Sequence, residues 1–75
     1  MKTATIQTYP LFQAKGWASR VGYRGKWLFE ATNLDKVGAM QQAEKFAKRN
    51  GFTNAKFYEE NHWGEVVSYS VKLKV

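Results

Sequence analysis

The sequence contains no cysteine, which excludes a disulfide framework and a thiolate metal site. It also contains no apolar run near the ~18 residues that a membrane span requires. The N-terminal residues 1–6 lack the apolar stretch of a signal peptide. These absences predict a soluble protein of a reducing cytoplasm.

Acidic residues are scarce, six against twelve Lys and Arg, and the net charge is +6. A field of that sign attracts polyanions such as nucleic acid, anionic lipid or acidic proteins, although it can also serve solubility alone. The length of 75 residues predicts a single domain over residues 1–75. So short a chain needs a dense core, for which three Trp, four Tyr and five Phe are available.

Alternating patterns predict three strands in the first half of the chain, over residues 4–9, 17–23 and 26–31. Pro10 ends the first strand because proline cannot donate to a ladder. Arg24-Gly25 links the other two as a hairpin. The alternation of the third strand places three residues on one face: Trp27, Phe29 and Ala31.

A helix is expected next, because Thr32-Asn33-Leu34-Asp35 combines a hydroxyl cap with an acid three residues on. One apolar stripe follows at helical spacing: Val37, Met40, Ala43, Phe46 and Ala47. Gly51 can adopt the left-handed conformation that ends a helix.

Two further strands are expected over residues 55–60 and 65–75. The last has one apolar face, formed by Val67, Tyr69, Val71, Leu73 and Val75. The order is therefore strand, strand, strand, helix, strand, strand. The predicted fold is α+β, with one helix packed on one face of a five-stranded, mainly antiparallel sheet. The edges of such an open sheet could pair, so we expect a monomer or an edge-strand dimer.

The other face of this sheet is expected to carry basic side chains and tyrosines, the ingredients of a nucleic-acid platform. An ordinary solvated sheet face is the alternative interpretation. The predicted contacts are Arg20, Arg24, Lys26, Lys56, Tyr58, Lys72 and Lys74. Secondary candidates are Tyr9, Lys45, Lys48, Arg49 and Trp63. The pattern leaves open whether Trp63 and Phe12 are buried.

Catalytic groups are few, since His62 is the only histidine and lies among Glu59, Glu60 and Glu65. A small ribonuclease toxin could use a histidine and a glutamate as acid and base, but a solvated turn explains the same residues. No metal-ligand spacing or phosphate loop is present. We expect no enzyme activity, no metal and no cofactor.

The segment Gly16-Trp17-Ala18-Ser19-Arg20-Val21, followed by Arg24-Gly25-Lys26, Thr32 and an amphipathic helix, resembles the arm-type DNA-binding domain of phage tyrosine integrases. The resemblance covers about half of the chain. It implies that a three-stranded sheet reads DNA through Arg20, Arg24 and Lys26.

The whole order of elements is similar to that of small phage-encoded anti-CRISPR proteins. The matching features are Trp17, Val21 and Gly25-Lys26 in a hairpin, and an alanine-rich helix ending in glycine (Ala39, Ala43, Ala47, Gly51). This resemblance implies a non-catalytic inhibitor in the host cytoplasm. It would dock on a host nucleoprotein effector complex and block DNA or nuclease access.

The charge is unevenly distributed along the chain. Residues 1–58 carry ten Lys or Arg against three acids, whereas residues 59–65 carry three acids and no Lys or Arg. Phosphates would be repelled by the second segment. We therefore expect Arg20, Arg24, Lys26 and the sheet lysines to matter more for binding than Lys45 or Lys48.

Overall fold

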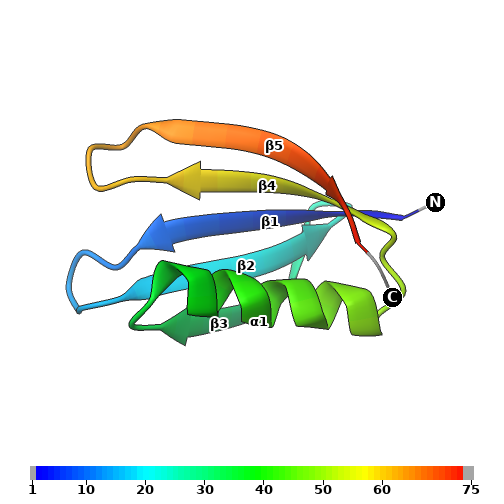
Figure 1. Ribbon diagram of the computed structural model, residues 1–75, viewed down its shortest axis with the longest axis horizontal. Coiled ribbons are helices and arrows are strands. Elements are labelled where there is room, and N and C mark those ends of the chain that lie inside the picture. The colour runs from blue at the N-terminus through cyan, green and yellow to red at the C-terminus, as the bar shows by residue number, and fades with distance from the viewer. Residues whose placement is uncertain (1, 74–75) are drawn as a thin grey trace.

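The computed structural model describes residues 2–73 and confirms the α+β class and the order of elements (Figure 1). Lys74 and Val75, expected in the last strand, lie outside the described residues. No helix in residues 2–73 is long and apolar enough to cross a membrane. The elements are β1 (Thr3–Pro10), β2 (Trp17–Tyr23), β3 (Lys26–Asn33), α1 (Lys36–Arg49), β4 (Asn54–Glu60) and β5 (Val66–Lys72).

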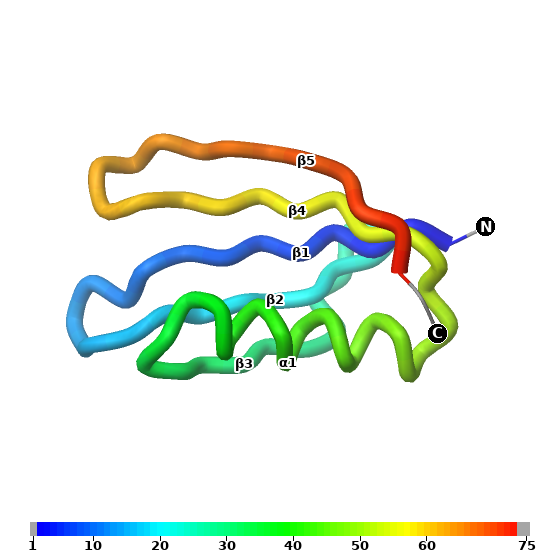
Figure 2. Tube along the Cα trace, in the orientation of Figure 1, coloured from blue at the N-terminus to red at the C-terminus, as the bar shows by residue number. Residues whose placement is uncertain are grey.

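The five strands form one sheet in the order β3-β2-β1-β4-β5. The pair β1–β4 is parallel and the other three pairs are antiparallel, so the sheet is mainly antiparallel as predicted. Because β1 and β4 run in the same direction, the β1–β2 loop and the β4–β5 turn lie at the same end of the sheet (Figure 2). We call this end, where α1 also begins, the loop end.

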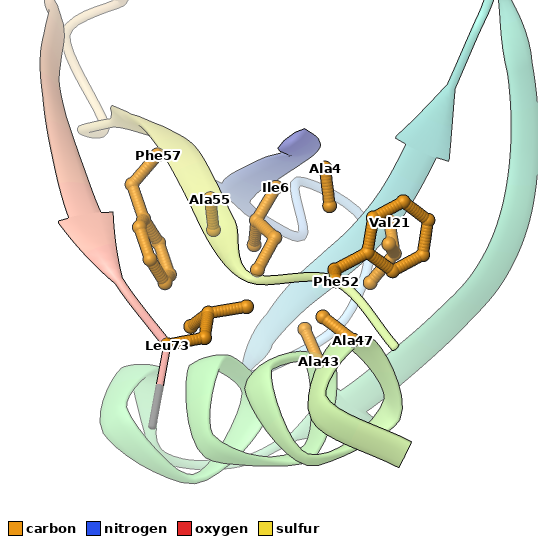
Figure 3. Packing of buried hydrophobic residues seen from close by; sticks show 9 residues of the cluster. All are labelled: Ala4, Ile6, Val21, Ala43, Ala47, Phe52, Ala55, Phe57 and Leu73. Carbon is orange, nitrogen blue, oxygen red and sulfur yellow. The ribbon is translucent and has the colours of Figure 1, made fainter. Parts of the chain in front are cut away.

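The helix α1 covers β1, β2 and β3 on one face of the sheet (Figure 1). It packs on the sheet through small residues. Ala39, Ala43 and Ala47 are completely buried in this contact. Larger side chains complete the core, and Figure 3 shows Leu73 and Phe57 on the β5 side of the helix. The core is therefore thin beneath α1 and thicker at its margins. Its central residues are Ala4, Ile6, Val21, Ala43, Ala47, Phe52, Ala55, Phe57 and Leu73.

The start of α1 corrects one sequence prediction. Thr32 does not cap the helix, because β3 continues to Asn33 and Thr32 pairs with Ala18 inside the sheet. Asp35 is the N-cap residue and makes no side-chain capping bond, while Asn33 Oδ1 accepts a hydrogen bond from the backbone N–H of Asp35 at 3.0 Å in the turn before the helix. At the other end, Gly51 has a φ of +82°, which confirms the predicted left-handed stop.

The prediction that Trp27 shares a face of the sheet with Phe29 and Ala31 is wrong. The ladder between β2 and β3 shifts register between Val21 and Gly22, so that Val21 pairs with Phe29 but Gly22 pairs with Trp27. This bulge adds one residue to β3 and reverses the alternation beyond it. Phe29 therefore stacks on Phe46 of the helix, with ring centres 4.5 Å apart, while Trp27 lies on the opposite face of the sheet.

A polar cluster joins α1 to β4 and β5 near the loop end. Lys36 forms an ion pair with Glu59, and the Tyr69 hydroxyl donates a hydrogen bond to the same carboxylate. Burial opposes ionisation of Glu59, but the hydrogen bonds from Lys36 and Tyr69 outweigh it and lower the Glu59 pKa. Burial, together with the hydrogen bond to Glu59, raises the pKa of Tyr69 to about 12.

We expect this cluster to make stability pH-dependent. Because the Glu59 pKa is lower in the folded chain, its stabilisation is complete above the unfolded value near 4.5 and is lost as pH falls through the folded value. Urea denaturation of the wild type and of Glu59→Gln should give a difference in unfolding free energy that shrinks below about pH 5. A difference that stays constant down to acid pH would contradict this role.

The alanine contact predicts that a larger residue beneath the helix is costly. Ala43→Leu should lower the free energy of unfolding by roughly 1–3 kcal/mol, since the helix must move away from the sheet. Gln42→Leu adds a similar side chain at an exposed position of α1 and should change stability by less than about 0.5 kcal/mol. Chemical denaturation measures both, and equal effects would mean that the contact is not tight.

Candidate nucleic-acid interface on the open sheet face

The face of the sheet opposite α1 is the candidate site, and we call it the open face. Residues that oppose one another on neighbouring strands share a face. Gln7 thus shares the open face with its partners Arg20 and Tyr58. The side chains of interest on this face are Gln7, Tyr9, Arg20, Trp27, Glu30, Lys56, Tyr58, Ser68, Ser70 and Lys72.

Arg20 lies at the centre of an ordered group on this face. Its Nε and Nη2 atoms donate to Gln7 Oε1 at 2.9 and 2.6 Å. Its guanidinium carbon is 3.9 Å from the centre of the Trp27 ring and 5.4 Å from that of Tyr9. Stacking and hydrogen bonding therefore hold the guanidinium in one orientation.

The neighbouring carboxylate of Glu30 forms no ion pair with Arg20 among the described residues. Glu30 pairs with Arg20 in the strand register, but its Oε2 accepts a hydrogen bond from the Tyr9 hydroxyl at 2.7 Å. That hydrogen bond, with burial, raises the pKa of Tyr9. Lys36–Glu59 is the only ion pair in residues 2–73. The positive charge of Arg20 is thus left available to an anion.

Gly22 explains why Trp27 can lie flat over β2. A Cβ atom at Gly22 would be 2.9 Å from two carbons of the Trp27 ring, closer than real side chains approach. Sequence reasoning missed Trp27 as a site residue, yet Gly22 is the signal for it. A glycine inside a strand pattern indicates a bulge or a close approach.

The other predicted contact residues lie partly on the open face and partly at the edge of the sheet or in the β2–β3 turn. The Lys56 ammonium lies 5.5 Å from the ring centre of Tyr58, and Lys72 opposes Asn54 on the outermost strand. Lys26 lines a hollow of ≈ 220 Å³ beside Trp27, but it opposes Tyr23, whose ring packs on Phe52 of the core. The bulge therefore turns Lys26 to the helix side of the sheet, and its predicted place on the open face is wrong. Arg24 packs over Tyr23, 5.2 Å from its ring centre, and so lies at the rim.

The secondary candidates are mostly elsewhere. Tyr9 belongs to the open face, but Lys45, Lys48 and Arg49 are carried by α1 on the other side of the sheet. Trp63 is 84% exposed in the β4–β5 turn, and Phe12 is 75% exposed in the β1–β2 loop. Both of these aromatic residues are therefore exposed, and both lie at the loop end.

The histidine region is not assembled as an acid–base pair. The His62 ring packs edge-on against Trp17, with ring centres 5.2 Å apart. Glu59 is engaged by Lys36 and Tyr69, and Glu65 accepts a hydrogen bond from Asn61. Within residues 2–73 no hydrogen bond joins His62 to a carboxylate, and no group of three potential metal ligands occurs.

Comparison with family models, curated proteins and solved structures finds no match for this chain. The likenesses to integrase arm domains and to anti-CRISPR proteins therefore remain predictions from short motifs. The geometry of the open face is the stronger basis for a function.

The packing of Trp27 on Gly22 gives a direct test of the open-face geometry. Gly22→Ala should displace the ring from Arg20, because the new methyl group occupies its place. Two-dimensional NMR of the indole N–H groups should then show a shifted Trp27 resonance. The Trp63 resonance is an internal reference, and Ser68→Ala is the control substitution. An unmoved Trp27 resonance would contradict the packing.

Proposed function

We propose that this protein is a non-enzymatic binding protein that holds single-stranded DNA or RNA on its open face. The observation that carries the proposal is the group around Arg20. An ordered guanidinium that has no ion-pair partner among residues 2–73 lies beside Trp27, whose side chain is 51% exposed. Such a group offers a cation to a phosphate and a flat surface to a base.

The spacing of the aromatic residues supports a single strand as the ligand. Trp27 on β3 and Tyr58 on β4 are separated by three strand-to-strand steps of about 4.8 Å and by two residues, about 7 Å, along the strands, which gives about 16 Å. A short run of unpaired nucleotides can bridge that distance, with bases stacked on the two rings. Bases in a duplex are already stacked on one another and offer no free face.

The basic residues around these rings would contact the phosphates. Lys56 is next to Tyr58, and Lys72 lies on the same face of the outer strand β5. Such contacts are not specific for sequence, because phosphates are the same at every nucleotide. We therefore expect affinity with little sequence preference.

A second candidate function is docking on a host nucleoprotein effector complex as an inhibitor, in the host cytoplasm. It is favoured by exposed apolar side chains that gather at the loop end, namely Phe12, Leu34 and Trp63. Exposed apolar patches mark protein interaction sites, and tryptophan is a frequent anchor. In this case the acidic segment 59–65 would face a protein partner rather than phosphates.

The stacking prediction separates these candidates. Trp27→Ala should weaken binding of a labelled single-stranded oligonucleotide about 5- to 150-fold, the equivalent of about 1–3 kcal/mol for one stacked base. Trp63→Ala is the matched control and should leave the affinity unchanged. Fluorescence anisotropy measures both. Loss of binding with Trp63→Ala but not Trp27→Ala would place the interface at the loop end.

The charge prediction concerns salt dependence. Neutralising Lys56 or Lys72 with glutamine should each reduce the slope of log affinity against log salt by about 0.7 for a single strand. Lys45→Gln and Lys48→Gln remove the same charge from α1 and should leave the slope nearly unchanged. Failure of the wild type to bind any DNA or RNA at low salt would contradict the proposal.

A further inference from the structure

The two edges of the sheet differ in how well they are protected from pairing with another strand. β3 is interrupted by the bulge at Val21/Gly22 and carries Lys26 and Glu30. β5 has an unbroken register along Val66–Lys72, no proline and a single charged residue, Lys72. A long, regular, weakly charged edge is a template for strand addition.

The sequence of β5 reads the same in both directions around Tyr69. The five residues are Val67-Ser68-Tyr69-Ser70-Val71. If two copies pair antiparallel about a two-fold axis through Tyr69, each residue opposes a residue of its own type. Val67 faces Val71 of the other copy, Ser68 faces Ser70, and Tyr69 faces Tyr69. Such self-complementarity is what a two-fold symmetric interface requires.

We propose that β5 pairs with the β5 of a second copy of this chain in an antiparallel ladder centred on Tyr69. Like residues then form the central cross-strand pairs. Val67, Tyr69 and Val71 lie on the helix side, and Ser68 and Ser70 lie on the open side. Lys72 opposes Val66, so no like charges meet among the described residues of the strand.

The exposure of β5 supports this pairing. Val66 and Val67 are 57% and 62% exposed in the single chain, and Tyr69 is 37% exposed. Strand addition would cover part of this apolar surface and pair the free backbone groups of the edge. One seven-residue strand pair gives less than the roughly 800 Å² per partner of a standard interface, so the dimer is weak and concentration-dependent.

The symmetry has a consequence for the open face. A two-fold axis perpendicular to the sheet keeps both open faces on one side and both α1 helices on the other. Lys56 and Tyr58 of each copy then flank the seam, because β4 is next to β5. The dimer itself does not depend on nucleic-acid binding. If the open face binds a single strand, two copies present one continuous surface to it.

The absence of cysteine from the chain makes the register testable with single-cysteine variants. Opposed residues in an antiparallel pair have Cα atoms about 4.5–5.5 Å apart, within the range that a disulfide bridges. Tyr69→Cys should therefore form a disulfide-linked dimer under mild oxidation. Val66→Cys lies on the same exposed strand but about 20 Å from its own copy, and should cross-link far more slowly.

A second pair of variants keeps Tyr69 intact. Ser68→Cys and Ser70→Cys mixed together should cross-link faster than either protein alone, because these positions face each other across the seam. Equal rates for all of these variants, or no cross-linking of Tyr69→Cys, would overturn the proposal.

The oligomeric state provides an independent measurement. Sedimentation velocity of the wild type should show an average mass that rises with concentration from monomer toward dimer. The double variant S68K/S70K places lysines opposite one another and should remain a monomer. The control L28K/T32K adds the same charge to β3 and should still dimerise. A wild type that stays monomeric at its highest soluble concentration would also overturn the proposal, whatever it binds.

Discussion

The contact between α1 and the sheet through alanine is the constraint on which the rest of the structure depends. Ala39, Ala43 and Ala47 have no exposed surface, and Ala4 faces the same thin layer. A helix that lies this close covers mainly β1, β2 and β3. Phe57 and Leu73 fill the margin toward β5, whose own residues stay largely exposed. One helix thus leaves a free sheet face and a free sheet edge.

The free face is organised by a second local feature, the bulge between β2 and β3. It turns Trp27 away from the core and places the ring over Gly22, against Arg20. Gln7 accepts hydrogen bonds from the Arg20 guanidinium, and Tyr9, which lies beside it, donates to Glu30. An ordered arginine loses less side-chain freedom when it binds an anion. The bulge therefore gives the candidate site on this face a defined shape.

Much of the fold could be predicted from alternation and helical spacing alone. Period-two patterns predicted all five strands, and they placed Arg20, Lys56, Tyr58 and Lys72 on the face away from the helix. Strand order could not be predicted, because periodicity does not say which strands pair, and the parallel contact of β1 with β4 is not local. Trp27 was misplaced because one extra residue reverses the alternation. The helix was predicted to start too early, with Thr32 as its cap, because β3 runs further than its pattern indicated.

The central claim is that the open face is the binding surface of this protein. Chemical-shift mapping by NMR, with a single-stranded oligonucleotide titrated into labelled protein, tests it most directly because it reports on every surface at once. We expect the largest changes at Gln7, Arg20, Trp27 and Tyr58, with the resonances of Phe12 and Trp63 unchanged. Changes confined to the loop end, or none anywhere on the sheet, would contradict the claim.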